Sequence, residues 1–176
     1  MILLTSDPVV GSTILATTLA ASGILVHRGV RGRRLAASIL ALFAGTAITL
    51  MLAAHNIEIL YRLAGGHVYT DPPLRYDFRV YSLLLMGVVL MVQGVRVLRS
   101  GVGISRGDAA ARRMGVRALL IVLAMSLPII PIHPFFGPIG SGLAVIGLLG
   151  MALAPPVPAD RAVRTNAPSE PASVGV

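Results

Sequence analysis

The sequence predicts an all-α membrane protein, a polytopic bundle of five transmembrane helices with the N-terminus outside. Three observations carry this prediction. Hydrophobic residues make up 55% of the 176 residues and charged residues only 12%, a composition typical of membrane proteins. Several apolar runs approach or reach the roughly 20 residues with which a helix crosses a bilayer. Arginines gather beside alternate ends of these runs.

The first two apolar runs cover residues 9–26 and 35–54. Positive charge follows the first run, whereas a secretory signal carries its charge before the apolar core, so we expect a retained first helix. Both runs have small residues at every fourth position. Because such ridges let helices approach closely in lipid, the pattern predicts a tight antiparallel hairpin of the first two helices.

Three further spans are predicted from the remaining apolar residues. A third run ends among arginines, and residues 118–154 carry no formal charge. Four prolines between Pro128 and Pro138 interrupt this last region, and they should end one helix before the next begins. The predicted spans are therefore residues 9–26, 35–54, about 80–98, about 114–131 and about 139–154.

The segments that connect and follow the predicted spans are assigned from their composition. Residues 100–117, rich in arginine and glycine, are expected to form a loop that leads into the fourth helix. The alternative topology has four spans and a re-entrant piece within residues 118–154. In either case residues 1–154 form the bundle. Residues 155–176 lack apolar periodicity and are predicted to be a disordered cytoplasmic tail.

The arginines predict the orientation, because cytoplasmic loops carry an excess of positive residues. Five spans with the N-terminus outside place 12 arginines inside and 3 outside. The inner set includes a cluster that we expect to contact anionic lipid headgroups: Arg28, Arg31, Arg33 and Arg34. All 15 basic residues are arginine, a bias typical of a GC-rich bacterial genome, so we expect a bacterial cytoplasmic (inner) membrane.

Composition also excludes several functions. The chain has no cysteine, so disulfides, thiolate metal sites and cysteine nucleophiles are excluded. The net charge of +8 does not indicate nucleic-acid binding, because the arginines flank apolar runs and form no basic face with interleaved aromatic residues. No phosphate-binding glycine loop, nucleophile elbow or zinc-binding helix motif occurs.

The outer loop, residues 55–79, is the predicted functional region. It holds two of the four histidines, three of the seven carboxylates and three of the four tyrosines. Tyrosine and arginine are frequent at the energetic centres of protein interfaces. We therefore expect a contact surface formed by Tyr61, Arg62, Tyr69, Arg75, Tyr76 and Arg79.

Histidines in this region also allow a metal or haem site. His55 and Glu58 share one helix face if the second helix continues, and His67 follows a Gly-Gly turn, so the three side chains resemble a two-histidine, one-carboxylate ligand set. Alternatively, His55 and His133 could be the two axial ligands of a haem. The simpler interpretation places these rings in the headgroup belt, with no cofactor.

Three functions remain open at this point. The first is a non-catalytic subunit or accessory component of a membrane complex, which contacts a membrane-protein partner or a second copy of the chain. The second is a metal- or haem-binding redox subunit. The third is a small transporter with its path at the proline break, since broken helices can line substrate sites. The bilayer is a partner in all three, and nucleic acid in none.

Overall fold

The computed structural model describes residues 8–64, 78–131 and 136–156, and these residues are almost entirely helical. Regular structure of any other kind does not occur in these three ranges, so the predicted all-α class is confirmed for them. The helices in chain order are α2 (Pro8–Val26), α3 (Gly29–Leu63), α4 (Phe78–Arg106), α5 (Ala109–Ser126), the short 3₁₀ turn η2 (Leu127–Ile129), and α6 (Phe136–Leu153).

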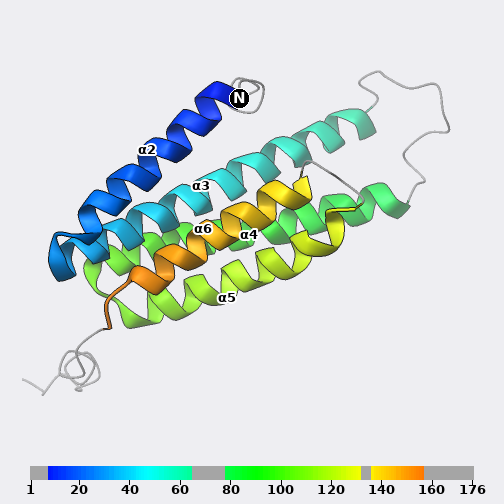
Figure 1. Cartoon of the computed structure of the whole chain (residues 1–176). Helices are drawn as coiled ribbons and strands as arrows, with labels where there is room; N and C mark the ends of the chain where they lie inside the picture. The colour runs from blue at the N-terminus through cyan, green and yellow to red at the C-terminus, as the bar shows by residue number, and fades with distance from the viewer. Residues whose placement is uncertain (1–7, 65–77, 132–135, 157–176) are drawn as a thin grey trace, which may run out of the picture.

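Helices α3, α4, α5 and α6 form an antiparallel four-helix bundle, and α2 lies outside it (Figure 1). Helix α3 packs on α4 and α6, and α5 packs on the same two helices, so the four enclose one core. Buried side chains of that core come from all four helices: Ile48, Leu52, Leu90, Val97, Leu119, Val122 and Met151. Helix α2 packs on α3 and diverges from it toward its own N-terminal end (Figure 1).

Helices α3 and α4 are in direct backbone contact along a row of glycines. The row pairs residues of α4 with residues of α3: Gly87 with Asn56, Gly94 with Thr49, and Gly101 with Leu42. Both partners advance by seven residues in opposite directions, which is the repeat of a left-handed antiparallel helix pair crossing at about 20°. A Cβ added at Gly45 would lie 2.7 Å from the Leu98 backbone nitrogen. Glycine therefore sets the separation of the two helices.

Helix α6 also uses glycine to approach α3. Gly147 lies against Ala44, and Gly150 lies against Leu40 and the Ala37 carbonyl. The small residues of α3 thus serve its contacts with α4 and α6. Helix α2 packs on α3 as predicted, but the small residues of α3 expected to hold the two helices tightly together contact α4 and α6 instead.

The small residues at every fourth position of α2 remain at the surface. Ser12, Ala16 and Ala20 are all exposed. Because α2 is apolar on every side, its sequence favours no particular face for packing, so spacing of small residues alone could not select its partner.

Helices α3 and α4 extend beyond their predicted limits at both ends, whereas α5 both begins and ends earlier than predicted. Arginine is a good helix former, so the arginines near residues 31–34 and 96–106 continue the helices that they were expected to flank. Only Gly107 and Asp108 separate α4 from α5. Gly107 has φ of 85°, a conformation suited to glycine at a helix end, and the Asp108 carboxylate accepts a hydrogen bond from the Ala110 N–H at 2.8 Å. The loop expected over residues 100–117 is mostly helix.

Within the described residues, three helices are long and apolar enough to cross a membrane by length and composition: Gly29–Tyr61, Val80–Arg106 and Phe136–Leu153. Helix α2 is apolar but shorter over its described core, Val10–Val26. Helix α5 carries three arginines in its first half, which lowers its hydropathy. With 35 residues, α3 is about 52 Å long, so it exceeds a hydrocarbon core of about 30 Å.

Every helix exposes large apolar side chains at its surface, for example Ile24 on α2, Leu50 on α3, Leu85 on α4, Leu120 on α5 and Leu149 on α6. Several hydroxyl side chains in the helices bond to backbone carbonyls; for example, the Thr49 hydroxyl donates to the Gly45 carbonyl at 2.7 Å. Such a surface is compatible with lipid contact.

Candidate functional site

His55 and Glu58 lie on the same helix, because α3 continues to Leu63. His55 is half-buried toward the bundle, whereas Glu58 is exposed. The His55 ring packs against the Phe136 ring of α6, with centroids 4.5 Å apart and planes inclined by 52°. This ring contact joins α3 to the first residue of α6, and it holds the imidazole at the end of the bundle where α6 begins.

A small cavity of about 40 Å³ lies beside His55. Its walls come from α3, α4, α5, η2 and α6, and they are almost wholly apolar: Ile48, Met51, Leu52, His55, Leu83, Met86, Gly87, Leu90, Val122, Ser126, Ile129, Phe136 and Gly140. Water needs only about 10–15 Å³ of such space, whereas drug-sized ligands occupy several hundred. The cavity can therefore hold a few small molecules and has no room for a macrocycle.

The predicted metal and haem sites fall partly outside the described residues. His67 and His133 belong to residues 65–77 and 132–135, of which the structure describes nothing. Within the described ranges, no three histidine, aspartate or glutamate side chains come together as a metal-binding group. Both ligand sets, His55 with Glu58 and His67, and His55 with His133, stay predictions.

Asn56 is a buried polar residue of this region that the sequence did not predict. Its side chain is 6% exposed, and neither amide atom has a hydrogen-bond partner. The Oδ1 atom lies against Gly87, at the position that a Cβ would occupy. At this position Oδ1 can accept a weak Cα–H···O hydrogen bond from Gly87. The seven-residue spacing of glycines in the third apolar run was the signal that could have indicated this contact.

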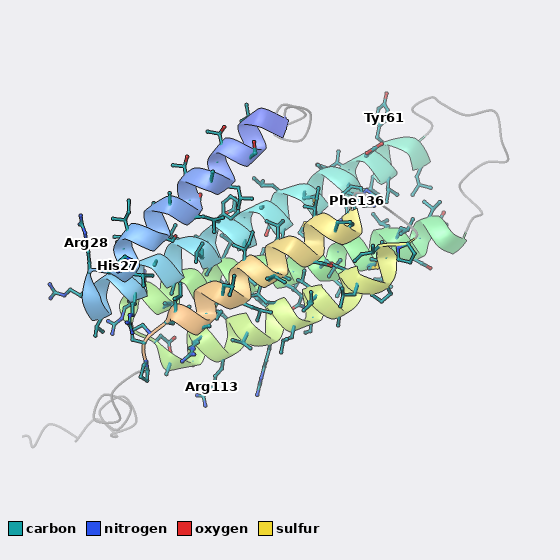
Figure 2. All side chains as sticks on the ribbon, viewed as in Figure 1. His27, Arg28, Tyr61, Arg113 and Phe136 are labelled. Atoms are coloured by element: carbon teal, nitrogen blue, oxygen red, sulfur yellow. The ribbon has the colours of Figure 1, made fainter. Side chains whose placement is uncertain are left out.

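The predicted contact surface is described in part. Tyr61 is 65% exposed near the end of α3 and points away from the bundle (Figure 2). Ile57 and Leu60 share that side of the helix and are also exposed. Arg62 belongs to α3 and Arg79 to α4, but the structure does not describe their side chains. Tyr69, Arg75 and Tyr76 lie outside the described residues.

The predicted headgroup cluster lies at the opposite end from Tyr61, near the turn between α2 and α3 (Figure 2). Gly29, with φ of 76°, makes this turn. Arg28, Arg31 and Arg33 are exposed. Arg34 is half-buried, with its guanidinium next to Gly107 in the turn between α4 and α5. It thus covers the neighbouring turn of the bundle.

Gln93, a polar residue within the third predicted span, is 6% exposed. Its side-chain carbonyl accepts a hydrogen bond from the Arg96 guanidinium at 3.2 Å. Arg96 itself is exposed. A buried amide on α4 therefore holds an arginine side chain at the bundle surface.

No family model, curated protein or solved structure matches the chain.

Proposed function

We propose that the chain is a small multi-pass protein of the bacterial cytoplasmic membrane, with five spans, and a non-catalytic subunit of a membrane complex. Support for the membrane placement comes from the large apolar side chains exposed on every helix and from three helices of spanning length. In the proposal α2 and α5 complete the five spans. Helix α2 contributes its uncharged length, and α5 with the following turn η2 contributes about residues 114–131, with the Arg113 and Arg117 side chains directed toward the cytoplasmic interface.

Arginine distribution supports an orientation with the N-terminus outside and the C-terminal tail in the cytoplasm. Arginines with described side chains occur in the first turns of α3, the second half of α4 and the first half of α5. These segments lie toward one end of the bundle, which is also where α6 ends (Figure 1). By the positive-inside rule that end faces the cytoplasm.

The proposed contact surface is the outer region, residues 55–79. The observation that carries it is the end of α3: because Phe136 at the start of α6 packs on His55, residues 57–63 extend beyond α6. Ile57 and Tyr61 on this extension are 64% and 65% exposed. Exposed tyrosine and aliphatic side chains at the outer end of a bundle suit contact with another membrane protein.

Photo-crosslinking in the native membrane tests the contact surface. A photoreactive amino acid replacing Tyr61 should form one discrete protein adduct, whereas the same residue replacing Leu149 on α6 should react with lipid. Adducts with lipid alone at both positions would contradict the proposal. The orientation is tested separately with Tyr61→Cys and Ser105→Cys, since the chain has no cysteine of its own. An impermeant maleimide should label only the first variant in intact spheroplasts, and the reverse pattern would invert the topology.

A further inference from the structure

Arg96 lies halfway along the apolar length of the bundle. It is two residues from Gly94, which packs on Thr49, so the antiparallel register places it level with Ala47 of α3. Residues 35–57 of α3 carry no formal charge and measure about 34 Å, and Ala47 is near their middle. Arg34 and Glu58 bound this run, about 20 Å and 16 Å from that level along the helix. The guanidinium therefore sits far from both charged ends of α3.

The direction of the Arg96 side chain moves its guanidinium further from the arginine-rich end of the bundle. Helical side chains lean toward the N-terminus of their helix, and α4 runs from the Tyr61 end toward the arginine-rich end. The hydrogen bond from Arg96 to Gln93 follows this lean, one turn away from the arginine-rich end. Arg117 occupies a similar level on α5, but α5 runs the opposite way, so its lean is toward the arginine-rich end. Among the arginines with described side chains, Arg96 is held away from that end by its hydrogen bond to Gln93.

Arg96 belongs to an exposed face of α4. This α4 outer face consists of Leu85, Val88, Val92, Arg96 and Arg99. Spacings of three and four residues place them on one side of the helix, and Leu85 is 67% exposed. Aliphatic residues at such spacing fit a second helix by left-handed packing. Gln93 accepts from only one of the five N–H donors of the Arg96 guanidinium, and a charge within hydrocarbon also favours an anionic partner.

We propose that the α4 outer face binds a transmembrane helix of a partner protein, and that Arg96 pairs with a carboxylate of that helix. The inference rests on the membrane placement proposed above and adds a contact within the bilayer. A second copy in the same orientation would place arginine against arginine, because the carboxylates of the described residues, Glu58 and Asp108, lie near the ends of the bundle. Lipid phosphates suit Arg96 less well, because they would have to reach the middle of α3.

Energy transfer in vesicles tests this pairing. The full chain carries a donor at Ser105→Cys and is reconstituted in phosphatidylcholine. The probe is an acceptor-labelled leucine-alanine transmembrane peptide with one aspartate at its centre, and the matched control peptide has asparagine there. We expect half-maximal transfer at an about tenfold lower peptide-to-lipid ratio for the aspartate peptide. Arg96→Gln should remove this preference, whereas Arg96→Lys and Arg113→Gln should retain it.

Equal transfer to the two peptides would overturn the proposal, as would a preference that survives Arg96→Gln. Loss of the preference when phosphatidylglycerol replaces part of the phosphatidylcholine would show that anionic lipid headgroups occupy Arg96 and would also overturn it. Carbonate extraction of the same vesicles tests the membrane placement by itself. A chain released by carbonate contradicts both proposals, and a retained chain without the aspartate preference contradicts this one alone.

Discussion

Replacing Gly45 by alanine should separate the two most closely packed helices. A Cβ at this position would lie 2.7 Å from the Leu98 backbone nitrogen and 2.9 Å from the Gly94 carbonyl oxygen. Ordinary contacts of this kind begin near 3.4 Å. Since both nearest atoms belong to the backbone, no side-chain rotation can relieve the overlap, and the axes of α3 and α4 must move apart.

The expected cost combines two opposing terms. Overpacking a close-packed site costs about 1–3 kcal/mol, and alanine in place of glycine within a helix returns about 1 kcal/mol. Gly45→Ala should therefore lower the free energy of unfolding by up to about 2 kcal/mol. Gly142 on α6 is the matched control, because a Cβ there meets nothing within 4 Å. Gly142→Ala should raise stability by about 0.5–1 kcal/mol.

Unfolding in mild detergent by added dodecyl sulfate, followed by circular dichroism, measures both variants against the parent chain. The decisive quantity is the difference between them, which cancels general effects of alanine on helix formation. The double variant Gly45→Ala with Gly94→Ala should lose less than the sum of the single losses, because both residues separate the same helix pair. If Gly45→Ala is as stable as Gly142→Ala, the glycine contact does not set the helix separation.

Three further outcomes test particular side chains. Asn56→Leu should raise the free energy of unfolding by about 1 kcal/mol, because it removes a buried amide without partners, and a loss would show that the amide has a bonding role. Asp108→Ala should lose about 1 kcal/mol with the α5 cap, and Asp108→Asn much less, as measured by thermal melting. His55→Ala should lose about 0.5–1.5 kcal/mol of ring contact with Phe136, which His55→Phe should largely retain. Elemental analysis of the parent chain and the two His55 variants tests the metal hypothesis, because neither alanine nor phenylalanine at position 55 can ligate a metal. Metal bound to the parent chain should be absent from both variants.

Much of the fold followed from features that act locally. Apolar run length identified the helices, and the residues near Pro128 ended α5 in a 3₁₀ turn as expected. Helix limits were less predictable. An arginine after an apolar run can end a span without ending the helix, since its backbone continues the hydrogen-bond pattern, and this is why α4 reaches Arg106.

Helix partners depended on contacts between distant residues. The ridge of small residues on α3 was correctly recognised as a packing surface, but nothing local identified α4 and α6 as the helices that use it. The pairing of α3 with α4 was encoded in Gly87, Gly94 and Gly101, because their seven-residue repeat matches the repeat of their contact residues on α3. Of the candidate site, His55 was placed in a ring contact with α6, while His67, His133 and much of the contact surface fall outside the described residues.

The seven-residue repeat between α3 and α4 has a consequence for alignment. A slide of one repeat, about 10 Å, would again set glycines of α4 against residues of the same α3 row. The packing of glycines against α3 therefore distinguishes poorly between alignments of the two helices that differ by seven residues. Sliding in one direction brings Leu42 to the level of Asp108, and sliding in the other moves Asn56 beyond the glycines to Val80, where its amide meets a branched side chain. In this chain the polar residues at the two ends of an apolar repeat select its alignment.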